Sequence, residues 1–200
     1  VVGFNQELFQ AENLWAQGLD LVSDNIPVLQ LASGVKTIGD GESHWAIRGV
    51  FGRFNYIFNN KYLLEMNGRY DGTSKFPKDS RFKFFPSFSA GWRISEESFM
   101  EEVRPIIQNL KLRASYGSLG NQDVNNYAYI PTYGLISQVG YIMNGTRPIG
   151  ITPPGLVSAN LTWETASTLD FGIDVTMFDK LTLNYDWYNR KTKDILTSAE

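Results

Sequence analysis

The sequence predicts an all-β protein, and more specifically a segment of an antiparallel transmembrane β-barrel. Three observations lead to this prediction. Several stretches of the chain alternate between apolar and polar side chains, the pattern of a strand with one apolar and one polar face. Very short connections between these stretches alternate with long ones. Aromatic residues (13 Phe, 10 Tyr and 5 Trp in 200 residues) gather near the ends of the stretches, as in the aromatic girdles of barrels.

The alternating stretches define seven expected strands. In order along the chain they cover 1–8, 45–58, 61–71, 83–94, 109–118, 161–177 and 181–193. The pattern is clearest in 64–71, where even-numbered positions are apolar or glycine and odd-numbered positions are polar. Several stretches exceed the roughly 5–6 residues typical of a soluble strand and match the roughly 9–11 residues that cross a bilayer.

The connections differ in length from one end of the expected sheet to the other. Asn59-Asn60 and Asp179-Lys180 are minimal turns, and asparagine tolerates the positive φ that a tight hairpin needs. The connection 95–109 is intermediate; Ser95 as N-cap and the acidic residues after it predict a short helix over 95–103, which Pro105 ends. Residues 9–44, 72–82 and 119–160 form long connections. Long loops on one side and short turns on the other are the layout of an outer-membrane barrel.

The alternation assigns side chains to two faces. The polar face is expected to line the lumen of the barrel, with these residues as candidates: Arg53, Asn55, Glu65, Asn67, Arg69, Arg93, Lys111 and Arg113. The apolar face is expected to carry aromatic side chains at the two membrane interfaces. These interface aromatics are Tyr56, Phe58, Tyr62, Tyr70, Trp92, Tyr116, Tyr185 and Trp187. Periodicity alone also fits a soluble β-sandwich whose core the aromatic side chains fill.

Composition excludes several classes of function. The net charge of −3, from 18 basic and 21 acidic residues, argues against an electrostatic nucleic-acid binder. The chain has no cysteine and one histidine, His44, so thiolate chemistry and His-rich metal sites are excluded, and His44 is expected to anchor an interface. We expect neither catalytic residues nor a cofactor.

The acidic residues are not expected to form an enzyme site. Glu96, Glu97, Glu101 and Glu102 are crowded on one short segment and are expected to form a solvated turn. Asp170 and Asp174 share a strand face about 13 Å apart, too far to share a proton. We therefore expect them to be hydrated or paired with Arg and Lys of adjacent strands.

Four strings in the sequence resemble the SusC/RagA family of TonB-dependent outer-membrane transporters. They are FGRFNYIFNNKYLLEMNGRYDGTSKF (51–76), FFPSFSAGWRISEESFM (84–100), LKLRASYGSLGNQ (110–122) and ANLTWETASTLDFGIDVTMFDKLTLNYDWYNRKTKDIL (159–196). They occur in the family's order and cover nearly half of the chain. The resemblance implies a 22-stranded barrel closed by an N-terminal plug, to which residues 1–200 contribute a partial barrel domain of about seven strands, without plug or signal peptide.

The resemblance also implies a setting and partners. The expected location is the outer membrane of a Gram-negative cell, with the short turns periplasmic and the long loops extracellular. The expected partners are outer-membrane lipids, a SusD-like surface lipoprotein, the TonB–ExbB–ExbD complex acting through the plug, and an oligosaccharide or peptide ligand. Four loop tyrosines are candidates to contact ligand or partner, or to pack within the loop: Tyr127, Tyr129, Tyr133 and Tyr141. The alternatives are a passive porin-type barrel and a soluble all-β carbohydrate-binding module.

Overall fold

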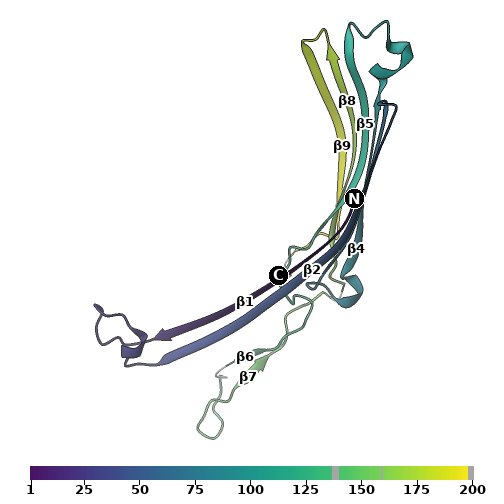
Figure 1. Ribbon diagram of the computed structural model, residues 1–200. Coiled ribbons are helices and arrows are strands. Elements are labelled where there is room, and N and C mark those ends of the chain that lie inside the picture. Colours follow the sequence, from purple (N-terminus) through teal and green to yellow (C-terminus); the bar gives the residue numbers. More distant parts are fainter. Residues whose placement is uncertain (137–139, 159, 198–200) are drawn as a thin grey trace.

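The computed structural model describes residues 1–136, 140–158 and 160–197, and its main feature is one curved antiparallel sheet (Figure 1). Seven strands pair in the order β1-β2-β3-β4-β5-β8-β9, so each strand of the sheet lies beside the one before it. Their bounds are β1 Val2–Gly18, β2 Lys36–Phe58, β3 Tyr62–Thr73, β4 Phe82–Arg93, β5 Ile107–Asn121, β8 Glu164–Met177 and β9 Leu181–Lys193. The expected all-β, antiparallel, seven-stranded segment is confirmed.

The remaining elements lie in the connections. Strands β6 (Gly134–Ile136) and β7 (Gly150–Thr152) form a separate small hairpin between β5 and β8. Four 3₁₀ turns complete the described structure: η1 Leu29–Leu31, η2 Lys78–Ser80, η3 Ile94–Glu96 and η4 Ser98–Met100. In the part of the chain that the structure describes, no helix is long and apolar enough to span a membrane.

The first hairpin is much longer than the sequence predicted. Strands expected over 1–8 and 45–58 extend over Val2–Gly18 and Lys36–Phe58, so most of the expected loop 9–44 is paired and only 19–35 forms the tip. In Figure 1 this hairpin runs well beyond the other strands. The prediction was too short because the outer half of the hairpin lacks apolar alternation: Gln10 and Glu12, for example, face His44 and Glu42.

The short turns close at the other end of the sheet. Asn59 and Asn60 have φ of 48° and 56°, and the Lys61 amide donates to the Phe58 carbonyl over 3.0 Å, which confirms the expected tight hairpin. In the β8–β9 turn the positive φ values fall on Phe178 (56°) and Asp179 (54°), one residue earlier than Asp179-Lys180.

The predicted helix over 95–103 is wrong. The segment forms η3 and η4, two separate 3₁₀ turns. Ser95 is buried, and its side chain caps no helix; instead its carbonyl accepts two hydrogen bonds from the Arg104 guanidinium, at 2.7 and 3.1 Å. Glu97 between the two turns is extended, with φ of −75° and ψ of 149°, and this interrupts a continuous helix.

The buried core of the described residues is small and lies at the end of the sheet that carries the long connections. Phe76, Phe85 and Trp163 are at most 5% exposed, and both phenylalanine rings meet the Trp163 ring edge-on with centroids 5.4 Å apart. The Trp163 indole donates to the Arg81 carbonyl over 2.9 Å. A Cβ on Gly120 would lie 2.2 Å from Phe85, so only glycine leaves space for that ring.

This aromatic cluster corrects the start of one expected strand. The strand predicted over 161–177 begins at Glu164, because Trp163 turns into the cluster. Nearby loop segments are joined by hydrogen bonds: the Ser80 hydroxyl donates to the Leu161 carbonyl (2.6 Å) and the Lys75 ammonium to the Val124 carbonyl (3.0 Å). The cluster therefore ties the β3–β4 and β5–β8 connections together. The other strand ends lie within three residues of the expected ones.

We predict that Trp163→Ala loosens these connections. Deleting a buried tryptophan side chain typically costs about 3–5 kcal/mol, and here it removes both ring contacts and the bond to Arg81. Limited proteolysis of the complete protein in detergent should show faster cleavage within 122–163. Tyr133→Ala, at an exposed loop position, serves as the control. Equal cleavage of Trp163→Ala and the control would contradict the role of the cluster.

Candidate functional site

The pairing register places the eight polar candidates on one face of the sheet, here called the polar face. Arg53 lies opposite Asn67, and Asn55 opposite Glu65, across β2 and β3. Arg93 lies opposite Lys111 across β4 and β5. Because side chains alternate strictly along a strand, register fixes the face of every other residue in the sheet.

In the described part of the chain, two groups of ion pairs join neighbouring strands on this face. On β2 and β3, Arg53 contacts Glu65 at 2.7 Å, and Asn67 donates to the other Glu65 oxygen over 2.8 Å. On β5, β8 and β9, the Arg113 guanidinium forms a bidentate pair with Asp174 (2.9 Å for each bond) and also contacts Asp186 at 2.9 Å.

The Arg113 group confirms that Asp174 pairs with a cation of an adjacent strand, and adds Asp186 as a second partner. A Cβ on Gly172, which faces Arg113 across the strands, would lie 2.7 Å from the guanidinium. Glycine at this position therefore lets the arginine lie flat against the sheet and reach both carboxylates.

Two other polar candidates, Arg69 and Arg93, have partners close by. Arg69 pairs with Asp71 on its own strand at 3.0 Å and lies over the Phe51 ring. Arg93 donates to the carbonyl and side chain of Asn60, so it supports the β2–β3 turn. Among the described residues, no group of His, Cys, Asp or Glu has the arrangement to hold a metal ion.

The opposite face, here called the apolar face, carries all eight aromatic candidates. Phe58, Tyr62 and Trp92 stack in a row beside the short turns, with centroids 6.4 and 6.5 Å apart. Tyr62 and Tyr70 are eight residues apart on β3, which is about 26 Å along a strand. A barrel's lipid-facing apolar band is about 25 Å tall.

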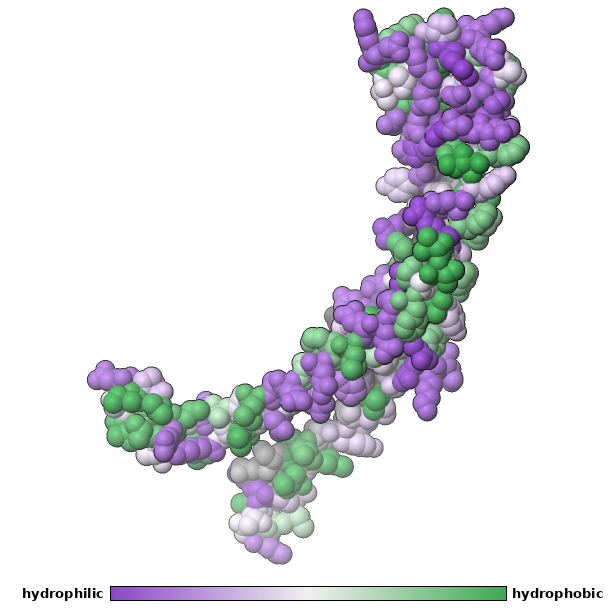
Figure 2. Space-filling model, in the orientation of Figure 1, coloured by the Kyte–Doolittle hydropathy of each residue, from purple (hydrophilic) through white to green (hydrophobic). Residues whose placement is uncertain are grey.

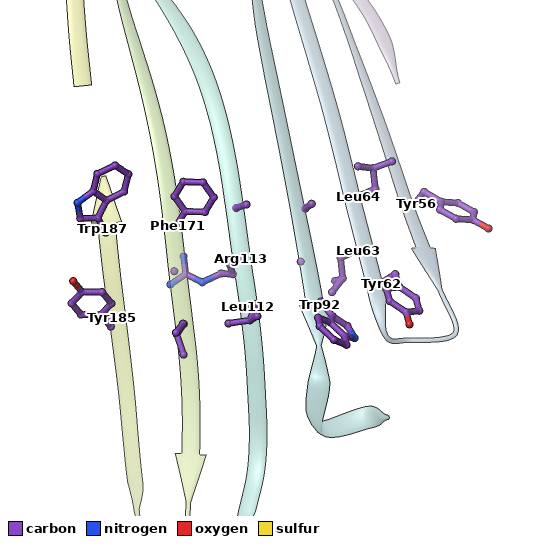
Figure 3. Close-up of a pocket in the computed structure, with 15 residues that line it drawn as sticks. Tyr56, Tyr62, Leu63, Leu64, Trp92, Leu112, Arg113, Phe171, Tyr185 and Trp187 are labelled. Carbon is purple, nitrogen blue, oxygen red and sulfur yellow. The ribbon is translucent and has the colours of Figure 1, made fainter. Parts of the chain in front are cut away.

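The large side chains of the apolar face are exposed. Trp92 is 37% and Tyr185 66% exposed, and most of the other large apolar residues of the face are exposed as well. Figure 3 shows a hollow on this face between Tyr56, Tyr62 and Trp92 from β2–β4 and Phe171, Tyr185 and Trp187 from β8–β9. Figure 2 shows hydrophilic residues gathered around the end with the short turns. A sheet that exposes its large hydrophobic side chains is suited to a nonpolar solvent.

The loop tyrosines divide into two pairs. The Tyr127 hydroxyl lies 2.8 Å from His44 Nδ1 and accepts from the His44 amide over 3.2 Å, while Tyr129 accepts from the Arg81 guanidinium over 3.4 Å. Tyr133 and Tyr141 are 66% and 59% exposed. Tyr127 and Tyr129 therefore take part in packing within the connections, whereas the rings of Tyr133 and Tyr141 are exposed to solvent.

Glu97 does more than the sequence predicted. Its carboxylate accepts hydrogen bonds from Lys61 Nζ (2.9 Å), the Tyr62 hydroxyl (2.8 Å) and the Trp92 indole (3.1 Å). These bonds, that of Lys61 first, lower the pKa of Glu97 to about 2. The expectation of a merely solvated turn is wrong for this residue, which joins the β4–β5 connection to the β2–β3 turn.

Sequence reasoning missed two of these groups, the aromatic cluster and the partners of Glu97. Phe85 is an aromatic residue among the polar-face residues of its strand. This interruption of the alternation is the sequence signal that points to a packed cluster. Glu97 has no comparable signal, because its partner Lys61 is 36 residues away and only the fold brings them together.

Taken together, the fold and its faces define the class: a wall segment of a β-barrel with one apolar and one polar face. Comparison with known proteins identifies the family. Residues 3–200 match the family model described as "TonB dependent receptor-like, beta-barrel", and the chain belongs to this family. The resemblance to SusC/RagA inferred from the four strings is confirmed.

Two relatives and one solved structure are similar to this chain. The chain is 41% identical over 155 residues to TonB-dependent receptor P26 of Formosa agariphila, covering 77% of this chain and 15% of that protein. It is 36% identical over 152 residues to TonB-dependent receptor SusC of Bacteroides thetaiotaomicron, covering 75% of this chain and 15% of SusC. The RagAB peptide importer in its closed-closed state shares the fold, with a TM-score of 0.82 at 23% identity over 97% of this chain and 21% of that one.

We predict that Glu97→Gln removes an acid sensitivity of the turn region. A lowered pKa means that the ionised carboxylate stabilises the fold above about pH 4.5, and that this contribution is lost as the pH falls through about 2. In thermal unfolding of the complete protein in detergent, the melting temperature should therefore fall more between pH 5 and pH 2 for the wild type than for Glu97→Gln.

The matched control is Glu101→Gln. Glu101 lies on the same connection and is exposed, with no side-chain partner recorded among the described residues. It should follow the wild-type pH profile. An identical pH profile for the wild type and Glu97→Gln would contradict the role of the Glu97 carboxylate.

Proposed function

We propose that this chain is part of the wall of an outer-membrane transporter that imports oligosaccharide or peptide and is driven by TonB. One observation carries the proposal: the sheet exposes large aromatic and aliphatic side chains on one face and pairs its charges on the other. This arrangement suits a wall between lipid and a hydrated lumen. Family membership adds the transporter class.

In this proposal the eight polar candidates face the lumen and the eight aromatic candidates mark the two membrane interfaces. The chain spans 15% to 19% of the length of the curated relatives it matches. The remaining strands, the plug and the segment that engages TonB–ExbB–ExbD belong to the proposed complete protein, in which these seven strands are part of a 22-stranded barrel.

The long connections are the proposed contact region for a SusD-like lipoprotein and for ligand. The β1–β2 hairpin and the β6–β7 hairpin both lie at this end of the sheet (Figure 1). Tyr133 and Tyr141 have open rings that suit stacking on a sugar or packing against a partner. Tyr127 and Tyr129 would hold the base of the loop in place.

The structure disfavours the soluble alternative. A carbohydrate-binding module needs a packed interior, whereas the buried hydrophobic residues of the described chain are Ala32, Phe76, Phe85 and Trp163. A passive porin shares the two-faced wall, so TonB dependence is the property that separates it from a driven transporter.

Uptake assays test the proposal. In the native host, cells lacking the complete gene should lose uptake of either a fluorescent oligosaccharide mixture or a fluorescent peptide mixture, and the gene on a plasmid should restore it. Cells lacking TonB should show the same loss. Uptake that persists without TonB would identify a passive pore, and unchanged uptake of both mixtures in the deletion strain would contradict nutrient import.

A further inference from the structure

One charged side chain of the sheet stands apart from the ion pairs of the polar face. Arg48 on β2 lies on the apolar face, two residues beyond Val50 in the direction of the long connections. Its guanidinium stacks on the Phe82 ring, 4.8 Å from the ring centroid. Among the described residues, no carboxylate contacts Arg48, whereas Arg53, Arg69 and Arg113 each pair with one or more.

The surroundings of Arg48 form a shaped hollow. Phe4, Val50, Tyr70 and Phe82 line it together with Arg48 and Gly49. The Tyr70 and Phe82 rings stack with centroids 5.4 Å apart. Gly72 lies between Arg48 and Phe82 across the three strands, and a Cβ there would lie 2.2 Å from the Phe82 ring. Glycine at this position lets Phe82 lie flat and reach Arg48.

The position of Arg48 along β2 sets the depth of its guanidinium in the proposed membrane. On β3, Tyr70 is the last large apolar residue of the face toward the long connections, and Arg48 pairs with Gly72, the next residue on the same face. An arginine facing lipid at the middle of a bilayer costs about 2–4 kcal/mol, but near an interface the cost falls to about 0–1. The guanidinium is therefore placed at headgroup level, with an apolar hollow directly on its membrane side.

We propose that Arg48 and this hollow bind a phosphorylated glycolipid of the outer leaflet on the outside of the barrel. This inference rests on the proposed function, which sets the apolar face in lipid and the long connections at the cell surface. An acyl chain would fill the hollow between Phe4, Val50 and Tyr70. The planar guanidinium, held by Phe82, would donate two parallel hydrogen bonds to a phosphate. Charge complementarity selects an anionic lipid, because no carboxylate in the described part of the chain pairs with this exposed cation.

Native mass spectrometry of the complete protein in detergent tests the site, with diphosphorylated lipid A and its dephosphorylated form as probes. The wild type should bind the phosphorylated probe in preference to the dephosphorylated one. Arg48→Gln should weaken that binding roughly tenfold, the effect of losing a hydrogen bond to a charged group. Arg48→Lys, which keeps the charge without the paired donors, should fall between the two.

Lys191→Gln is the matched control. Lys191 on β9 lies on the same face and also beyond the band, opposite Ser167, but lines no aromatic hollow. It should bind the phosphorylated probe as the wild type does. Inorganic phosphate should not displace the lipid; displacement would indicate a site for phosphate alone and would overturn the assignment to a lipid.

The outcomes separate this site from the function on which it rests. Each variant is first shown to reside in the outer membrane and to keep the gel mobility of an unboiled, folded barrel. If such a folded Arg48→Gln protein binds the phosphorylated probe as tightly as the wild type, or the wild type binds both probes equally, the lipid site is overturned and the transporter proposal stands. If the wild type is absent from the outer membrane, both fail.

Discussion

Pairing of backbone hydrogen bonds between neighbouring strands is the constraint on which this structure depends. Inside a bilayer no water satisfies peptide groups, so strands must pair continuously with their neighbours. Strands β1 to β5, β8 and β9 pair with adjacent strands in an unbroken antiparallel order. The β4–β5 ladder covers Ser87–Arg93 of β4, and the register shift in β5 falls between Ile107 and Asn109, beside the short turns. Irregular backbone is confined to the two ends of the sheet.

The division of side chains between two faces follows from the same constraint. Because the backbone is satisfied within the sheet, one face is free to be apolar, and large side chains such as Phe88 and Trp187 occupy it. The charges are then concentrated on the other face, where Arg113 pairs with both Asp174 and Asp186 at hydrogen-bond distance. The Glu97 bonds and the Trp163 cluster lie beyond the two ends of the band and hold the connections in place.

Much of the wall was predictable because its periodicity is local. Residues 64–71 reveal both faces without any knowledge of their neighbours, and Asn59-Asn60 reveals the turn before them. The extension of β1 and β2 was not predictable, because both faces carry polar groups there: Gln10 and Glu12 lie on one face, and Asn13 and Gln17 on the other. The Glu97 and Trp163 contacts and the stacking of Arg48 on Phe82 depend on register across several strands, which no local pattern encodes.

The central claim is that the apolar face meets lipid and the polar face meets water. This chain contains no cysteine, so spin labels can be placed one at a time along 87–92 of β4 through single cysteines, with any others in the complete protein replaced. In liposomes, labels at Phe88, Ala90 and Trp92 should be more accessible to oxygen, and labels at Ser87, Ser89 and Gly91 to a water-soluble nickel chelate. The account predicts this alternation with a period of two. Uniform accessibility along the strand, or nickel preference at Phe88 and Ala90, would contradict it.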